Sequence, residues 1–263
     1  MKVALYQMNI VWENKEQNYI NVEKMLRATN GQKIDLLLLP EMSLTGFSMN
    51  TDRTKESDND TIKRMIVLAK KYSVAIAFGW VKDCGIKSEN RYTVVSKEGI
   101  IISDYVKIHP FSYSKEDEMF QGGKRVPCFY LNDICFSSFI CYDLRFPEIF
   151  QIASKNSNVI LLAANWPEER SEHWKCLLRA RAIENQVYII AVNCVGKING
   201  INYSGDSCII NPNGQVQKKL SGEEGILYYD LEDDVQLFRN CFSLKKDRKE
   251  SLYCKMYDEF YQK

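Results

Sequence analysis

The sequence predicts an α/β protein that forms one domain over residues 1–263, and three observations support this prediction. Apolar runs of strand length alternate with amphipathic stretches of helix length along most of the chain. Short polar turns join several neighbouring strands, which indicates hairpins and therefore mixed rather than wholly parallel sheets. No Gly/Ser-rich linker, internal repeat or low-complexity stretch divides the chain.

The individual elements follow from these patterns in chain order. Residues 2–9 and 34–39 have strand character, and residues 13–29 between them place apolar side chains at helical spacing. Pro147 fits the first turn of a helix. The predicted helices cover residues 13–29, 58–72, 147–155 and 172–185. The predicted strands cover residues 2–9, 34–39, 74–80, 91–96, 100–107, 134–140, 159–163, 187–194, 207–211, 215–219 and 226–229. Turns at 97–99 and 212–214 join two of the strand pairs, and the charged, aromatic tail 245–263 is expected to pack on a surface or a partner subunit.

Composition narrows the classes of function. The chain has 35 Lys and Arg against 34 Asp and Glu, a net charge of +1, so it lacks the single-sign field that attracts nucleic acid or anionic membranes. No apolar run reaches the roughly 18–20 residues that span a bilayer, and the N-terminus lacks a secretory leader, so we expect a cytoplasmic protein. Nine cysteines without C-x-x-C spacing indicate reduced thiols, and two histidines leave little basis for a metal site. The usual dinucleotide and nucleotide-triphosphate motifs are absent, so we expect no cofactor.

Three reactive side chains stand at the predicted carboxyl ends of strands, where active sites of α/β proteins gather. They are Glu41, Lys107 and Cys141. Taken singly, each has a plainer explanation as a loop carboxylate, an exposed amine or an inert buried thiol. Together they would bring a base, a cation and a nucleophile to the same end of the predicted strands.

The segments around these residues resemble the Glu, Lys and Cys signatures of the nitrilase superfamily of carbon–nitrogen hydrolases, and the resemblance covers nearly the whole chain. The matching segments are Pro40-Glu41-Met42 with Thr45-Gly46-Phe47, Lys107-x-His109, and Cys141-Tyr142-Asp143-Leu144-Arg145-Phe146-Pro147-Glu148. Further stretches resemble the ω-amidase branch, which hydrolyses the terminal amide of 2-oxoglutaramate and related 2-oxo acids. These are Asn165-Trp166-Pro167, the run from Arg179 to Gln186, and Gly205-Asp206-Ser207 with Asn211-Pro212-Asn213-Gly214.

The resemblance implies a four-layer α-β-β-α sandwich with two mixed sheets, and a homodimer that buries a helical layer and the tail 245–263. It also implies that Cys141 attacks an amide carbonyl after Glu41 takes its proton, while Lys107 and the backbone N–H of Tyr142 hold the oxyanion. A second acid of the family follows the Lys signature. The spacing to Gly122-Gly123 favours Glu118 over Glu116 for that position.

The substrate contacts are less determined by the pattern. A 2-oxo dicarboxylic monoamide needs a cation for its far carboxylate, and Arg145, Arg170 and Lys115 are candidates. Arg145 could instead pair with Asp143 or Glu148, and Arg170 could be a solvated loop charge. Phe111, Phe120 and Trp166 are candidate walls of the pocket. For His109 we expect a structural hydrogen bond rather than catalysis.

Three other functions stay open at this point. The same scaffold supports a nitrilase or an N-carbamoyl amidase. A non-catalytic protein could keep the pocket to bind a small ligand without turnover. A glutaminase subunit that feeds ammonia to a synthetase would need a partner, because this chain has no nucleotide-binding segment of its own.

Overall fold

Two β-sheets lie face to face in the computed structural model, which describes residues 1–29, 31–232 and 234–261. Within these residues the first sheet has six strands. Their order is β13 (Gly225–Asp230), β1 (Lys2–Gln7), β2 (Leu36–Leu38), β3 (Ala75–Asp83), β4 (Ser88–Val95) and β5 (Ile101–Val106). The pairs β1–β2 and β2–β3 are parallel and the others are antiparallel, so the sheet is mixed.

The second sheet has seven strands in the part of the chain that the structure describes. Its order is β10 (Val195–Ile198), β11 (Ile201–Ile210), β9 (Tyr188–Asn193), β8 (Val159–Ala164), β7 (Ile134–Ile140) and β6 (Cys128–Leu131), and β12 (Val216–Ser221) pairs with β11. The pairs β7–β8 and β8–β9 are parallel, whereas β6, β10, β11 and β12 pair antiparallel. This sheet is therefore mixed as well.

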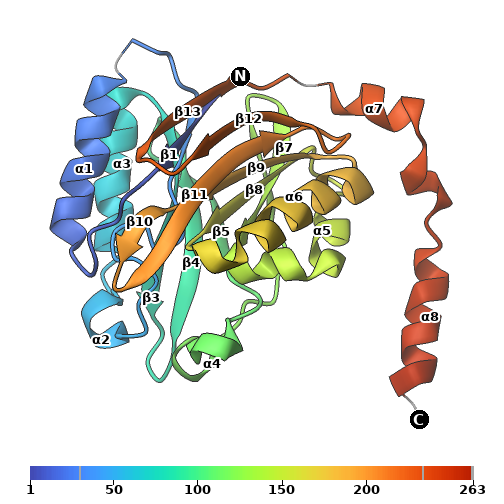
Figure 1. Ribbon diagram of the computed structural model, residues 1–263, viewed down its shortest axis with the longest axis horizontal. Helices are drawn as coiled ribbons and strands as arrows, with labels where there is room; N and C mark the ends of the chain where they lie inside the picture. Colours follow the sequence, from blue (N-terminus) through green and yellow to red (C-terminus); the bar gives the residue numbers. More distant parts are fainter. Residues whose placement is uncertain (30, 233, 262–263) are drawn as a thin grey trace.

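Helices cover the outer face of each sheet (Figure 1). The helices α1 (Lys15–Ala28) and α3 (Asp60–Tyr72) lie on the first sheet, and α5 (Pro147–Ala153) and α6 (Ser171–Asn185) lie on the second. The shorter helical segments are α2 (Thr51–Thr54), η1 (Ser112–Ser114), α4 (Glu116–Met119), η2 (Cys141–Arg145), η3 (Glu168–Arg170), α7 (Val235–Cys241) and η4 (Leu244–Asp247). A last helix, α8 (Glu250–Tyr261), ends the described chain. The predicted four-layer α-β-β-α sandwich with two mixed sheets is confirmed.

The alternation of side chains along β2 shows how the layers are held together. Leu36 and Leu38 belong to the apolar cluster between the two sheets. Leu37 and Leu39 belong to the cluster that packs the first sheet against α1 and α3. All four are fully buried, as expected for a central parallel strand with both faces covered.

Three stretches of strand were missing from the sequence prediction. The structure adds β6 and β10, and it begins β11 at Ile201 rather than at residue 207. A β-bulge between Gly205 and Ser207, with Asp206 at φ +60°, interrupts β11. A bulge shifts the side-chain alternation by one residue, so the period-2 signal fails on its N-terminal side.

The C-terminal segment crosses the carboxyl ends of α5 and α6. Arg248 donates to the carbonyl of Glu184, Arg239 donates to that of Ser157, and Lys245 donates to that of Ser154. Cations are favoured at these ends because the last carbonyls of a helix lack intrahelical partners. The chain is thus anchored as far as the first residue of α8, where Glu250 pairs with Lys155.

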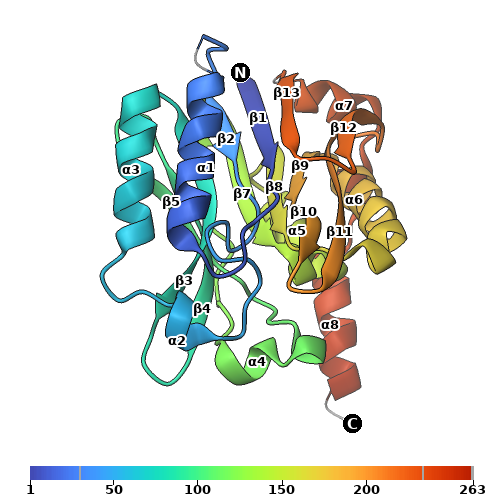
Figure 2. The same ribbon diagram turned by 60° about the vertical axis from the view of Figure 1, so that its left-hand side comes forward.

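Beyond this anchor, α8 stands apart from the body of the molecule (Figures 1 and 2). Its residues Leu252, Met256 and Phe260, spaced four apart along one face, are 45%, 58% and 75% exposed. That the tail packs at a subunit interface stays a prediction, and Gln262 and Lys263 lie outside the described residues. Among the described helices, none combines the length and the apolar character that a membrane span requires.

Candidate active site

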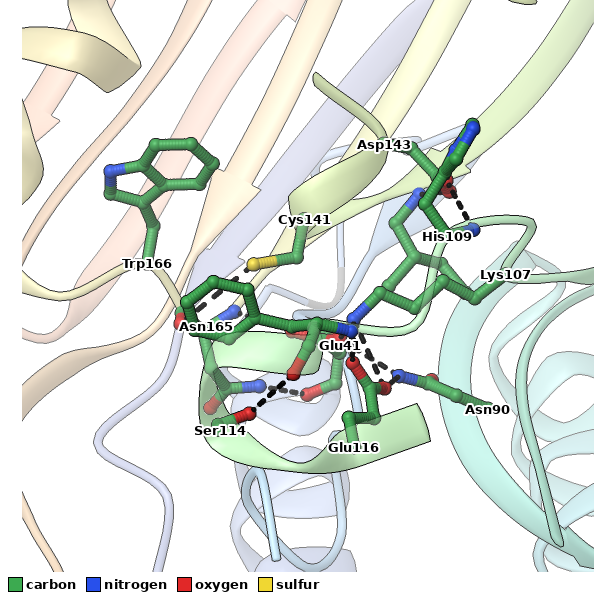
Figure 3. A network of polar contacts seen from close by, with 12 residues as sticks. Glu41, Asn90, Lys107, His109, Ser114, Glu116, Cys141, Asp143, Asn165 and Trp166 are labelled. Carbon is green, nitrogen blue, oxygen red and sulfur yellow. Dashed lines mark hydrogen bonds and ion pairs between the residues drawn. The ribbon is translucent and has the colours of Figure 1, made fainter. Parts of the chain in front are cut away.

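Glu41, Lys107 and Cys141 meet between the two sheets. Glu41 follows β2 and Lys107 follows β5 in the first sheet, whereas Cys141 follows β7 in the second. The Lys107 Nζ lies 2.9 Å from Glu41 Oε1, and both side chains are almost completely buried (Figure 3). The predicted convergence of a carboxylate, an ammonium and a thiol at strand ends is therefore present in the structure.

The second acid at this centre is Glu116, and the sequence-based choice of Glu118 was wrong. Glu116 Oε2 lies 2.8 Å from Lys107 Nζ, and the Glu116 side chain is fully buried. Glu118 is exposed and lies 3.8 Å from the amine of Lys115. Lys115 adopts φ +61° directly before α4 and turns the first residue of that helix inward. A residue two positions later on a helix faces the other way, which explains the position of Glu118.

Two asparagines hold the carboxylate of Glu41. Asn90 Nδ2 donates to Glu41 Oε1 at 2.8 Å and to Glu116 Oε1 at 3.0 Å, so it links the two acids. The backbone N–H of Asn165 donates to Glu41 Oε2 at 2.9 Å, and its side-chain amide donates to the Glu41 carbonyl. Sequence reasoning missed Asn90. Asn165 belongs to the Asn165-Trp166-Pro167 segment, but nothing in the sequence indicates that it contacts Glu41.

Close backbone packing fixes the turn that carries Glu41. A Cβ atom added to Gly79 of β3 would lie 2.2 Å from the backbone nitrogen of Met42, so no larger residue fits there. Met42 itself adopts φ +43°, an unfavourable conformation for a residue with a side chain. Position 79 of β3 therefore requires glycine, because the backbone of the Glu41 turn packs directly against it.

Cys141 lies at a sharp turn from β7 into η2, with φ +43°. The buried carboxylate of Asp143 braces this turn. It accepts from the backbone N–H of Ile140, from the Tyr105 hydroxyl and from the backbone N–H of His109. The ring Nδ1 of His109 also lies 2.8 Å from Asp143 Oδ1 (Figure 3). His109 thus makes the structural hydrogen bond that the sequence predicts, and it ties the Lys107 segment to the Cys141 turn.

The electrostatics of the centre keep Cys141 protonated. Burial raises the pKa of the Cys141 thiol well above its ordinary value, and the nearby carboxylate of Glu41 adds to this effect, while the Lys107 ammonium opposes it. Burial alone would lower the pKa of Lys107, but the charges of Glu116 and Glu41 outweigh it and raise that pKa. Burial raises the pKa of Glu116. The resting centre therefore holds a neutral thiol beside an ammonium, and the thiol needs a base to become a nucleophile.

A cavity of about 680 Å³ opens onto Cys141 and Lys107. Five of the seven residues named as substrate-site candidates line it: Phe111, Tyr142, Arg145, Trp166 and Arg170. Phe47 and Tyr203, which were not assigned, line it as well. Lys115 does not, and neither does Phe120, which packs in a separate small apolar cluster.

The two arginines of the cavity differ in their partners. Arg170 lies 2.5 Å from the carboxylate of Glu169, so its charge is compensated. Arg145 makes no ion pair with any residue that the structure describes, and thus pairs with neither Asp143 nor Glu148. Its guanidinium lies 4.8 Å from the Trp166 ring centroid and 3.3 Å from His173 Nδ1. Arg145 is therefore the cavity arginine whose charge is available to a ligand.

Glu116 and Glu118 should act differently on the Cys141 thiol. Because the charge of Glu116 contributes to the raised pKa of Cys141, Glu116→Gln should lower that pKa. At pH 8, below the pKa, the thiolate fraction rises roughly tenfold for each unit by which the pKa falls. We expect iodoacetamide to alkylate Cys141 about 3- to 10-fold faster in Glu116→Gln, as measured by mass spectrometry of the Cys141 peptide. The matched control, Glu118→Gln, should leave the rate unchanged; equal rates in both variants would contradict the arrangement.

The family model and the relatives that match this chain all describe hydrolases. Residues 2–240 match the family model described as carbon-nitrogen hydrolase. The Staphylococcus aureus protein named "Hydrolase in agr operon" is 32% identical over 96% of this chain and 100% of its own length. The "2-oxoglutaramate amidase" of Bacillus subtilis is 33% identical over 95% of this chain and 98% of its own length.

A solved structure supports the same grouping. The Xanthomonas campestris protein XC1258, described as a CN-hydrolase superfamily protein with an arsenic adduct in its active site, superposes with a TM-score of 0.89 at 28% identity. The superposition covers 95% of this chain and 97% of that one. A shared fold, a matching family model and relatives aligned over nearly their full length lead to one conclusion: the chain belongs to the carbon–nitrogen hydrolase family.

Proposed function

We propose that this protein hydrolyses the terminal amide of a small 2-oxo acid monoamide, such as 2-oxoglutaramate, to a carboxylate and ammonia. The observation that carries the proposal is the meeting of Glu41, Lys107 and Cys141, of which Lys107 and Cys141 line a cavity that also contains an arginine without an ion-pair partner. The Bacillus subtilis relative named 2-oxoglutaramate amidase supports the choice of substrate. A nitrilase or an N-carbamoyl amidase on this scaffold remains the enzyme alternative, and a non-catalytic binding protein the alternative of another class.

In the acylation step, the Cys141 sulfur attacks the amide carbon while Glu41 accepts the thiol proton. The carbonyl oxygen becomes an oxyanion, which the Lys107 ammonium and the backbone N–H of Tyr142 hold. An ammonium has three N–H donors, and Glu41 and Glu116 can accept two of them. The third donor is then free for the oxyanion, so Glu116 acts by orienting Lys107.

The remaining steps return the site to its starting state. Glu41 gives its proton to the departing nitrogen, the carbon–nitrogen bond breaks, and ammonia leaves a thioester on Cys141. Water then attacks the thioester carbon while Glu41 takes one water proton. When the carbon–sulfur bond breaks, Glu41 returns the proton to sulfur, and the acid product leaves.

At the far end of the substrate, we propose that Arg145 binds the carboxylate. Arg145 lies four residues after Cys141 within the same short η2 segment, so the distance between nucleophile and cation is held by local backbone. Stacking on Trp166 and the contact with His173 orient its guanidinium without neutralising it. Arginine suits a carboxylate because its planar group donates two parallel hydrogen bonds.

We further propose a homodimer located in the cytoplasm. The apolar side chains along one face of α8 are exposed, and exposed apolar surface of this kind usually marks an interface. A second copy of the chain would bury this face. All nine cysteines are free thiols, which suits a reducing compartment.

The substrate and the nucleophile can be tested together. We expect the protein to release ammonia from 2-oxoglutaramate faster than from glutamine, asparagine or a simple nitrile. Cys141→Ala should lower that turnover by at least about 10⁴-fold, because the covalent route is lost. The matched control is Cys84→Ala, an exposed cysteine that does not line the cavity. Turnover that survives in Cys141→Ala would reject the mechanism, and faster release from the nitrile would favour the nitrilase alternative.

Arg145→Met should act on binding of the carboxylate. Loss of a charge-assisted contact worth about 1.5–3 kcal/mol should raise KM for 2-oxoglutaramate about 10- to 100-fold. Hydrolysis of butyramide, which has no carboxylate, should change little, and Arg145→Lys should restore part of the affinity. If Arg170→Met raised KM and Arg145→Met did not, the carboxylate site would have to be reassigned.

Light scattering after gel filtration tests the dimer. We expect a species of about 61 kDa, twice the 30.6 kDa of one chain. Met256→Glu, in the middle of the apolar face of α8, should shift the population towards the monomer, because a buried charge opposes association. The matched control is Ile86→Glu, which changes a fully exposed isoleucine at the β3–β4 turn. A monomeric unmodified protein, or a dimer insensitive to Met256→Glu, would count against this role of the tail.

A further inference from the structure

Tyr203 combines burial with an unused hydroxyl group. It lies on β11, only 6% exposed, and its side chain belongs to the same buried apolar cluster as Cys194 and Ile198. It also lines the cavity that contains Cys141. Its hydroxyl makes no hydrogen bond to any residue that the structure describes, whereas the buried hydroxyls of Tyr92 and Tyr105 both find partners. The hydroxyl oxygen is not among the fully buried side-chain atoms that lack a partner, so it keeps some accessible surface and a ligand in the cavity that Tyr203 lines can reach it.

Several other polar side chains that line the cavity already have protein partners. Lys107 binds Glu41 and Glu116, and Ser114 donates to the carbonyl of Phe111. The side-chain amide nitrogen of Asn165 donates to the carbonyl of Glu41, whereas its oxygen, which can only accept, has no partner among the described residues. The indole N–H of Trp166 donates to the carbonyl of Arg170. Besides Arg145, Tyr203 is therefore a group of the inner wall that can still bind a ligand.

The chemistry of this hydroxyl is that of a hydrogen-bond donor. Burial raises the pKa of Tyr203, and nearby Cys194, Cys141 and Glu41 act in the same direction, with Arg170 opposing them. The phenol thus stays protonated throughout the neutral range. Tyr203, Cys141 and Arg170 also line the same cavity.

We propose that the Tyr203 hydroxyl donates a hydrogen bond to the 2-oxo oxygen of the substrate and so selects 2-oxo acid amides. This assignment rests on the proposed function and adds a residue to it. In 2-oxoglutaramate the ketone stands between the amide carbon, which Cys141 attacks, and the carboxylate, which Arg145 binds. A ketone oxygen can only accept a hydrogen bond, which matches a donor. The 2-ammonium group of glutamine has no lone pair to accept the donor, and it would lie near two arginines.

The test compares two amides that differ only at the ketone. Glutaramate has a methylene group where 2-oxoglutaramate has the 2-oxo group. In Tyr203→Phe, we expect kcat/KM for 2-oxoglutaramate to fall about 10- to 100-fold, the effect of losing a hydrogen bond that a buried site is built to make. For glutaramate, kcat/KM should stay within about twofold of the unmodified protein. The melting temperature should not fall, because the hydroxyl that is removed has no protein partner.

The matched control is Tyr130→Phe, which removes the hydroxyl of an exposed tyrosine on β6 that does not line the cavity. It should leave both kcat/KM values unchanged. An equal fall for both amides in Tyr203→Phe, or no fall for either, would overturn the assignment of Tyr203 while leaving the proposed function intact. Failure of the unmodified protein to hydrolyse either amide would overturn the proposed function and this assignment with it.

Discussion

The structure of the site depends on one buried cation held by two buried carboxylates. Lys107 contacts Glu41 at 2.9 Å and Glu116 at 2.8 Å, and all three side chains are removed from water. Burying charges is costly, and removing one partner of such a group leaves an uncompensated charge inside the protein. Asn90 bridges the two acids, so the centre behaves as a single unit. Because its members come from separate segments of the first sheet and the loop after it, the fold must be complete before the centre exists.

Cys141, the proposed nucleophile, is held at this centre by backbone contacts rather than by a direct ion pair. Cys141 and Met42 both adopt positive φ angles, and Gly79 admits the Glu41 turn against β3. Strained backbone of this kind persists only where the surroundings determine it, and here Asp143 supplies much of that support. Its carboxylate joins Ile140, next to Cys141, to His109, two residues after Lys107. Both sheets therefore contribute to one rigid geometry.

The charged and polar groups around Lys107 differ from Arg145 and Tyr203 in whether they have partners within the protein. At the centre the charges of Lys107, Glu41 and Glu116 compensate one another. Arg145 lines the same cavity without an ion-pair partner among the described residues, and the Tyr203 hydroxyl lines it without a hydrogen-bond partner there. Groups left unsatisfied in a buried site favour ligands that satisfy them. In the proposed function, reaction chemistry and substrate choice thus reside in different residues. The α8 helix also has groups without partners, because its apolar side chains stay exposed within the described chain.

Local patterns in the sequence determined the alternation of strands and helices, the mixed sheets and the strand-end positions of Glu41, Lys107 and Cys141, since these depend on periodicity and on neighbouring residues. The choice between Glu116 and Glu118 depended on a left-handed turn at Lys115, which spacing does not reveal. Tyr203 was missed because the bulge at Asp206 hid the start of its strand. The difference between Arg145 and Arg170 lay in which one had an acid beside it. Only the tertiary structure decided these points, because burial and pairing are properties of residues brought together in space and not of their order along the chain.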